Sequence, residues 1–554
     1  MSDPNLTVTA RVPASLTPLL QESLVLAAEQ QVERRLREGD ATLWAPLGTP
    51  EVANRLGWLT IAERMLAELA EVEAFAADVR EQGFQDVVLL GMGGSSLAPE
   101  VLRRSFGQRP GEPRLHVLDS TDAADIRAVQ DAVDPPQTLF IVSSKSGGTI
   151  EPLSLFAHFW STVEDGGHFV AITDPGSGLE QLAREQGFRR TFAGDPNIGG
   201  RYSALSAFGV VPAALMGVDV RALLSGASGA WETAIATATA TDDQGPPAPA
   251  QQTAAVWLGA ALSALARAGR DKLTFVIAES LPGLGLWLEQ LVAESTGKHG
   301  TGILPVADEP PGEPGVYGED RVFAYLPHLG APDAALDARV SALAQAGHPV
   351  ITIPTRGPGD LGRVFLLAEL AVAVAGWGLQ IDPYDQPNVQ QAKDATKRVL
   401  DDYEANHQLP QVADAQETEL RALLLDGTPP DYVAIMAYLK PSPEFDEAAG
   451  ELRATIREHT RATTTFGYGP RFLHSTGQFH KGGPKTGRFL QLVHDGPSDV
   501  EIPGASYTFT TLKNAQAIGD LETLRENGLP AERVRLQGDD PVGALRAFTA
   551  TLKE

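Results

Sequence analysis

The feature that most constrains the fold of this chain is a strand–loop–helix pattern that repeats along its first half. Short apolar runs occur at residues 86–91, 114–119, 139–143 and 169–174, each followed by a polar loop and a segment of helical composition. Repetition at intervals of roughly 25–30 residues is typical of a parallel, doubly wound sheet. In such sheets, ligands bind at the carboxyl ends of the strands, near the point where the strand order reverses.

Two of these loops are rich in glycine and hydroxyl groups. The run at 139–143, LFIVS, has the composition of a strand buried on both faces, and SKSGGT (residues 144–149) separates it from a predicted helix. Unpaired N–H groups and the positive end of a helix meet there, which favours an anion. The spacing is not that of a nucleotide P-loop. An ordinary turn is the alternative, but GMGGSS (residues 91–96) lies at the same sheet edge and favours the anion site.

Composition excludes several classes of protein. The chain carries 44 Lys and Arg against 71 Asp and Glu, spread along its length, for a net charge of −27. Such a charge repels nucleic acid and anionic membranes, so a phosphate ligand needs a local cationic pocket. The absence of cysteine excludes disulfides and thiolate catalysis. No signal peptide or long uninterrupted apolar run is recognisable, and we expect a cytoplasmic protein with neither nucleic acid nor membrane as partner.

The 554 residues are enough for three to four units of about 150 residues each. Helical periodicity near the N-terminus predicts amphipathic helices that cover a sheet. A linker composition, TDDQGPPAPAQQ at 241–252, indicates a boundary, and apolar runs at 272–280, 321–327 and 348–355 predict a second α/β unit. We therefore expect a helical wrapper (1–80), a first sheet domain (81–240), a second sheet domain (253–414) and a C-terminal α/β extension (415–554). Within the extension we expect strands at 431–439 and 488–495, and a strand followed by a helix at 506–528.

Two further segments carry polar groups suited to sugar chemistry. Gln290 and Glu294 are four residues apart and share one face of a predicted helix. Arg201 follows two glycines, which allow close approach of the backbone and a fixed guanidinium. Taken alone, Glu294 is most simply a solvated carboxylate and Arg201 a surface ion-pair partner. Together, however, a carboxylate and a fixed cation suit a proton transfer that develops negative charge on an oxygen.

Five motifs together resemble those of the glucose-6-phosphate isomerase family. They are GMGGS (91–95), SKSGGT (144–149), GGR (199–201), Gln290 with ESTGK (294–298), and DQPNV (385–389) followed by Lys393. The resemblance covers about residues 85–400. It implies two doubly wound parallel-sheet sugar-isomerase domains and interconversion of glucose 6-phosphate and fructose 6-phosphate through an enediolate, without metal or cofactor.

The same resemblance implies roles for individual residues. Glu294 is the base and Arg201 stabilises the enediolate, while Gln290, Gln386 and Lys393 line the site. The residues that hold the phosphate are implied to be Ser95, Ser144, Lys145, Ser146 and Thr149.

The histidine expected for ring opening is displaced. In most relatives it lies between the glutamate and lysine motifs, where this chain has only His299, His328 and His348 in other settings. LHSTGQ at 473–478 resembles the histidine motif of bacterial forms, which makes His474 the candidate; His480 competes for this role or contacts the substrate. This order resembles the isomerase half of bifunctional transaldolase/glucose-6-phosphate isomerases.

Several alternatives stay open at this stage. We expect isomerase activity without transaldolase activity, since no transaldolase barrel is recognisable. An isomerase that also accepts mannose 6-phosphate would use the same acid and base, and a non-catalytic sugar-phosphate-binding module would keep the serine loops. A homodimer, with the histidine supplied by the same or the other chain, is a further open expectation.

Overall fold

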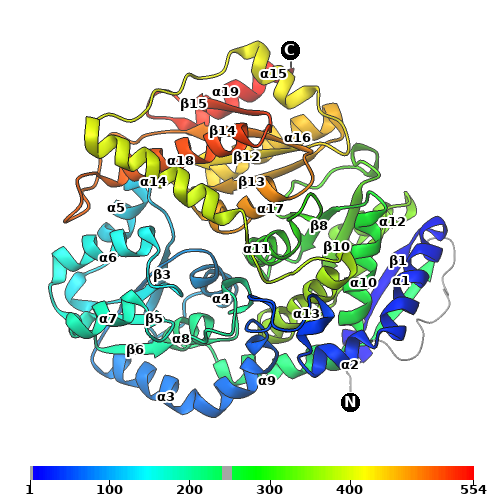
Figure 1. The fold of residues 1–554 in the computed structure, drawn as a ribbon, viewed down its shortest axis with the longest axis horizontal. Helices are drawn as coiled ribbons and strands as arrows, with labels where there is room; N and C mark the ends of the chain where they lie inside the picture. Colours follow the sequence, from blue (N-terminus) through cyan, green and yellow to red (C-terminus); the bar gives the residue numbers. More distant parts are fainter. Residues whose placement is uncertain (1–3, 240–252, 554) are drawn as a thin grey trace.

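The computed structural model describes residues 4–239 and 253–553, and its three sheets form three lobes around the centre of the molecule (Figure 1). The predicted α/β class with parallel sheets is confirmed. The predicted linker at 241–252 lies outside the described residues.

The first sheet is parallel throughout, in the order β3-β2-β4-β5-β6. The chain passes from β2 outward to β3 and then returns to β4, so the strand order reverses between β2 and β4. Every residue of these two central strands is buried, as expected of a sheet covered on both faces. The strands are β2 (Asp86–Gly91), β3 (Arg114–Leu118), β4 (Thr138–Ser143), β5 (Phe169–Thr173) and β6 (Arg190–Ala193).

The second sheet has the order β7-β1-β11-β10-β8-β9 and corrects the prediction for the N-terminal segment. The segment 1–80 is not purely helical, because β1 pairs antiparallel with β11 and parallel with β7. Thus β7, inside the expected first domain, also completes the second sheet. The strands are β1 (Val8–Val12), β7 (Ile235–Thr239), β8 (Lys272–Ile277), β9 (Leu304–Val306), β10 (Arg321–Leu326) and β11 (Val350–Thr352).

The C-terminal extension contains a third, fully parallel sheet in the order β13-β12-β14-β15. The strand expected at the start of 506–528 does not form; Thr508 instead caps helix α18, its hydroxyl accepting from the Thr511 N–H. The strands are β12 (Tyr432–Tyr438), β13 (Thr463–Tyr468), β14 (Gly487–Val493) and β15 (Ala531–Arg535).

Helices cover both faces of the sheets (Figure 1). The N-terminal segment and first unit contain α1 (Thr17–Glu29), α2 (Val32–Arg37), α3 (Ile61–Glu81), α4 (Leu97–Phe106), α5 (Ala123–Ala132), α6 (Ile150–Val163), α7 (Gly178–Glu185), α8 (Ala207–Leu215) and α9 (Val220–Ala227). The second unit contains α10 (Ala254–Arg267), α11 (Leu284–Thr296), α12 (Ala334–Gln345) and α13 (Leu361–Leu379). The remaining helices are α14 (Val389–Asn406), α15 (Glu417–Leu425), α16 (Pro443–Thr460), α17 (Gly477–Gly482), α18 (Phe509–Glu526) and α19 (Pro541–Lys553).

Helix α13 is the apolar centre of the second unit. The stretch Gly357–Leu379 is long and apolar enough to cross a membrane by length and composition, but 94% of the 18-residue apolar window within it is buried inside the protein. It packs closely on α10 because Gly259 has no side chain: a Cβ there would lie 2.5 Å from Val374 Cβ. This is the environment of a core helix.

The third unit packs against both others. One apolar cluster joins Phe140 and Phe159 of the first unit to Leu400 of α14 and Phe509 of α18. Another joins Ala293 of α11 to side chains of the third sheet and α17. A bidentate ion pair adds to these contacts, since Arg471 Nε and Nη2 donate to Asp119 Oδ2 and Oδ1 at 2.8 and 2.6 Å.

The Arg471–Asp119 pair generates a test of this packing. The Asp119 side chain is only 1% exposed, so Arg471→Met leaves an unpaired buried carboxylate, a loss of about 3–5 kcal/mol. We expect a fall of several degrees in the melting temperature, measured by calorimetry. Arg546→Met is the control, because Arg546 pairs with Glu447 and Glu451 on the surface; equal falls in the two variants would contradict the assignment.

Candidate active site

A cavity of about 300 Å³ opens at the carboxyl ends of β2 and β4, where the strand order of the first sheet reverses. All three units contribute to it. The predicted residues that line this cavity are Ser95, Lys145, Ser146, Thr149, Arg201, Gln290, Glu294, Gln386, Lys393 and His474.

Two glycines allow the walls of the cavity to approach each other. Gly93 has a φ of +53°, and a Cβ at this position would lie 2.8 Å from the carbonyl oxygen of His474. At Gly94, a Cβ would collide with the backbone of Gly200. The glycine-rich loop after β2 therefore fits directly against the segment that carries Arg201.

The loop after β4 presents the open end of helix α6. Thr149 is the N-cap residue of α6, but its side chain makes no capping hydrogen bond, so the first-turn N–H groups stay available to an anion. Ser146 is exposed at the cavity. Ser144, which was predicted to contact the phosphate, does not line the cavity; its buried hydroxyl donates to Thr149 Oγ1 at 3.1 Å.

Lys145 lines the cavity but already has protein partners. Its Nζ donates to Asp174 Oδ2 and to the carbonyl of Asp195, at 2.5 and 2.8 Å. Burial lowers the pKa of Lys145, although the Asp174 carboxylate opposes this effect. Arg55, from the N-terminal segment, lines the same cavity beside Lys145, Arg201 and Lys393, and is a cation that the sequence did not indicate.

Glu294 and Arg201 form a buried pair at the centre. Their side chains are 6% and 2% exposed, and Arg201 Nε lies 3.5 Å from Glu294 Oε2. Arg201 Nη2 donates to the carbonyls of Tyr384 and Asp385, while the buried Nη1 has no partner among the described residues. Burial raises the pKa of Glu294 despite the opposing charge of Arg201. The site thus combines a strengthened base with a free guanidinium donor.

Gln290 connects this pair to the segment carrying His474. Its Nε2 donates to the carbonyl of His474 at 2.9 Å and lies 3.5 Å from Glu294 Oε2. Because Gln290 and Glu294 share one face of α11, the predicted i, i+4 relation places both in the cavity.

His474, in the 3₁₀ turn Arg471–His474 after β13, reaches across to the first unit. Its Nε2 lies 2.9 Å from Oε1 of Glu151, in the first turn of α6, and Gln516 Nε2 of α18 donates to the same oxygen at 2.7 Å. Burial alone would lower the pKa of His474, but the charge and hydrogen bond of Glu151 raise it above its usual value. The reverse effect of His474 lowers the pKa of the buried Glu151.

The prediction that His480 contacts the substrate is corrected. His480 is buried in α17, does not line the cavity, and places Nδ1 3.0 Å from the Tyr432 hydroxyl. Burial lowers the pKa of His480 to about 3, so this imidazole is neutral and structural. His299, His328 and His348 do not line the cavity either.

The loop that carries Gln386 is held by a buried lysine. Lys298 Nζ donates to the carbonyl and carboxylate of Asp385, both at 2.6 Å, and burial lowers the pKa of Lys298 to about 8. Gln386 and Lys393 are themselves exposed at the cavity mouth. Among residues 4–239 and 253–553, no cluster of three His, Asp or Glu side chains is arranged to hold a metal.

Sequence reasoning missed Glu151, Gln516 and Arg55. Glu151 carried one available signal, an acidic residue in the first helical turn directly after the serine–glycine loop. Gln516 and Arg55 lie far along the chain from every motif and carried none.

Comparison with known proteins agrees with this geometry. A sequence profile of phosphoglucose isomerase matches residues 67–319. The glucose-6-phosphate isomerase of Rubrobacter xylanophilus is 31% identical over 374 residues, which cover 58% of this chain and 84% of that protein. The corresponding enzyme of Carboxydothermus hydrogenoformans is 29% identical over 416 residues, 63% of this chain and 85% of that protein.

Solved structures show the same fold. A hypothetical protein from Thermus thermophilus superposes with a TM-score of 0.57 at 26% identity, covering 70% of this chain and 99% of its own. A glucose-6-phosphate isomerase from Chlamydia trachomatis gives 0.54 at 19% identity, covering 70% and 86%.

The parallel sheets place the chain in the sugar-isomerase fold class, and the relatives that it matches are aldose–ketose isomerases. More specifically, the chain belongs to the glucose-6-phosphate isomerase family.

The His474–Glu151 contact predicts a titration. Glu151→Gln removes the two largest influences that raise the pKa of His474, the charge and the hydrogen bond of Glu151. Burial and the charge of Lys393 then lower this pKa, and only the weaker influence of Glu294 raises it. Nuclear magnetic resonance of histidine-labelled protein should therefore show a pKa above 6.5 in the wild type and a lower one in the variant, with His474→Ala to assign the signal. An unchanged pKa in Glu151→Gln would remove Glu151 as the partner.

Proposed function

We propose that this protein interconverts glucose 6-phosphate and fructose 6-phosphate, with Glu294 as the base. The observation that carries the proposal is the buried Glu294–Arg201 pair in a cavity that also contains the open N-terminus of α6. Membership of the isomerase family supports a hexose phosphate as substrate.

Proton transfer takes place on one carboxylate. In the open-chain sugar, Glu294 removes the proton from C2 and returns it to C1, which converts the aldose to the ketose through an enediolate. The raised pKa of Glu294 makes it a stronger base than a solvated glutamate. The partnerless Nη1 of Arg201 suits a developing oxyanion, because a donor fixed in advance needs no reorganisation.

Ring opening falls to His474 and its partner. The hydrogen bond to Glu151 fixes the imidazole orientation and stabilises its charged form, so His474 can exchange a proton with the ring oxygen. Lys393 lies at the same cavity and offers a second proton-exchanging group. The phosphate sits at the N-terminus of α6, near Ser146, Thr149 and Ser95.

The order of the motifs supports a narrower proposal. A histidine motif that follows the lysine motif, in an added α/β unit, resembles the isomerase half of bifunctional transaldolase/glucose-6-phosphate isomerases. We propose that this unit supplies the histidine in cis, because His474 reaches Glu151 and the cavity of its own chain. Activity on mannose 6-phosphate, a cytoplasmic location and a homodimer remain predictions. The alternative of a non-catalytic sugar-phosphate-binding module is disfavoured, because such a module would have no need of Glu294.

The anion loop gives a first kinetic test. The double change Ser146→Ala, Thr149→Ala removes two hydroxyls that donate to a charged acceptor, each worth about 1.5–3 kcal/mol. We expect KM for fructose 6-phosphate to rise well over tenfold in a coupled assay.

The matched control for this loop is Ser161→Ala, Thr162→Ala. These hydroxyls lie at the other end of α6 and donate to carbonyls of their own helix. A KM that stays constant in the loop variant, or rises equally in both, would place the phosphate elsewhere.

A second test separates the base from the ring opener. Glu294→Gln should abolish turnover of every substrate, including hydrogen exchange on a ketose phosphate too short to close a ring, because it removes the basic carboxylate. His474→Ala should lose about 10²–10⁴-fold on cyclic substrate, the usual worth of acid–base assistance, and keep exchange on the short ketose. The measurements are a coupled assay and proton exchange in deuterated water.

The control histidine is His480→Gln, since His480 packs on Tyr432 away from the cavity. We expect no selective loss on cyclic substrate. If His480→Gln showed that loss while His474→Ala did not, the assignment of the ring opener would be wrong.

A further inference from the structure

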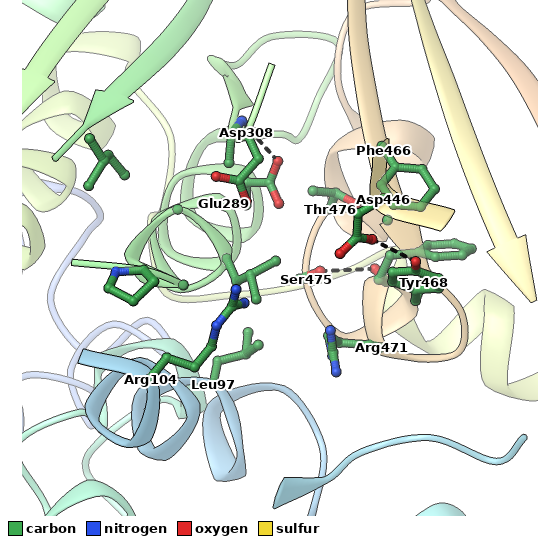
Figure 2. Close-up of a pocket in the computed structure, with 18 of the residues that line it drawn as sticks. Leu97, Arg104, Glu289, Asp308, Asp446, Phe466, Tyr468, Arg471, Ser475 and Thr476 are labelled. Atoms are coloured by element: carbon green, nitrogen blue, oxygen red, sulfur yellow. Dashed lines mark hydrogen bonds between the residues drawn. The ribbon is translucent and has the colours of Figure 1, made fainter. Parts of the chain in front are cut away.

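A second and larger cavity, of about 470 Å³, lies beside the candidate active site (Figure 2). It opens at the carboxyl ends of β8, β9 and β13, with α4 on a third side. It therefore lies between the second and third sheets, at the strand ends where α/β sheets ordinarily bind ligands. The isomerisation proposed above does not use it.

One side of this cavity is suited to an anion. Arg104 of α4 is directed into the cavity and makes no hydrogen bond or ion pair with any described residue (Figure 2). It adjoins the N-terminus of α11, whose cap residue Gly283 has a φ of +82° and no capping side chain. A Cβ on Gly283 would lie 3.2 Å from Arg104 Cδ, so glycine keeps room for this arginine beside the start of α11. The N–H groups of Leu284 and Leu286 donate to the carbonyls of Leu281 and Gly283, so the guanidinium of Arg104 is the group that favours a phosphate or carboxylate.

The opposite side is suited to hydroxyl groups. Tyr468 donates to Asp446 Oδ1 at 2.6 Å, which leaves the other carboxylate oxygen for a ligand (Figure 2). Thr476 lines the cavity, is only 7% exposed, and its hydroxyl has no partner in the described part of the chain. The Thr476 oxygen itself is not fully buried, so a ligand in the cavity can reach it.

Glu289 adds a buried acid between these sides. It is 6% exposed, and Oε1 accepts from the N–H of Ala307 at 3.2 Å. Burial, with the nearby charge of Asp308, raises the pKa of Glu289 to about 8. At neutral pH the group is therefore protonated, so it donates a hydrogen bond and does not repel an anion.

The other charges in the cavity already have protein partners or lie in solvent. Arg471 is paired with Asp119, and Arg453 donates to the carbonyls of Ala307, Asp308 and Thr464. Glu279 and Asp308 are exposed, as is Arg104 itself. Among the cations that line the cavity, Arg104 is the one without a partner in the described part of the chain.

We propose that this cavity is a second binding site for a polyhydroxylated anion, a sugar phosphate or a sugar acid, whose anionic group contacts Arg104 and whose hydroxyls contact Asp446, Thr476 and Glu289. The site shares structure with the active site: Glu289 precedes Gln290 on α11, and Ser475 and Thr476 follow His474. The bound anion regulates isomerisation through these elements, a part that rests on the proposed function.

Binding is tested by calorimetry on the full chain with sorbitol 6-phosphate and, separately, gluconate. We expect sorbitol 6-phosphate to bind at two sites per chain. Arg104→Gln and Asp446→Asn should each weaken one event at least tenfold, whereas Ser146→Ala, Thr149→Ala should weaken only the other. If the wild type binds gluconate and Arg104→Gln does not, a carboxylate is sufficient as the anionic group of the ligand at the second site. If the second site binds sorbitol 6-phosphate but not gluconate, the ligand must carry a phosphate.

The matched control is Arg184→Gln, an exposed arginine on α7 far from this cavity, which should keep both events. Thermal melting checks that each variant is folded. The proposal of a second site would be wrong if the wild type showed a single binding event with each probe. It would also be wrong if two binding events appeared and neither was weakened by Arg104→Gln or Asp446→Asn.

Regulation has its own readout. At saturating fructose 6-phosphate, the probe that binds the second site should change kcat in the wild type and leave kcat of Arg104→Gln unchanged. A constant kcat with the second site filled would refute regulation while leaving the binding site intact, and absence of isomerase activity without any probe would refute the proposed function instead.

Discussion

The contact between the first and third units is the interaction on which the site depends. Arg471 pairs with Asp119 at the carboxyl end of β3, and three residues later His474 meets Glu151 at the start of α6. Both carboxylates are almost fully buried, so removing the partner of either one costs stability. Together they fix the position of the turn that carries the histidine relative to the loop that binds the anion.

Glu294 and His474 lie in one cavity but have different electrostatic environments. In the proposed mechanism, the base needs a raised pKa and the ring opener needs a stabilised positive charge. Burial supplies the first at Glu294, while Glu151 supplies the second at His474. Gln290 connects the two, because it lies near the glutamate carboxylate and donates to the backbone of the histidine. A hydrogen-bonded network of this kind holds acid and base at a fixed separation.

The sequence predicted the parts of the site that depend on local pattern. Strand, glycine–serine loop and helix follow one another in the chain, so the anion loops and the Gln290–Glu294 face were predictable. Strand β1 was not, since it pairs with β11 more than 300 residues away. Glu151 has the appearance of an ordinary acid at a helix start, and only the fold brings His474 to it. His480 was misassigned because α17 turns its ring inward onto Tyr432.

The central claim is that one chain contains the complete site, with the histidine supplied by its own third unit. Mixing inactive Glu294→Gln with inactive His474→Ala, after dissociation and reassembly, tests this claim most directly. If Glu294 and His474 act within one chain, no combination of the two variants contains a complete site, and the mixture stays as inactive on fructose 6-phosphate as its components. Recovery of a substantial fraction of wild-type activity would show that the histidine crosses between chains and would contradict the account.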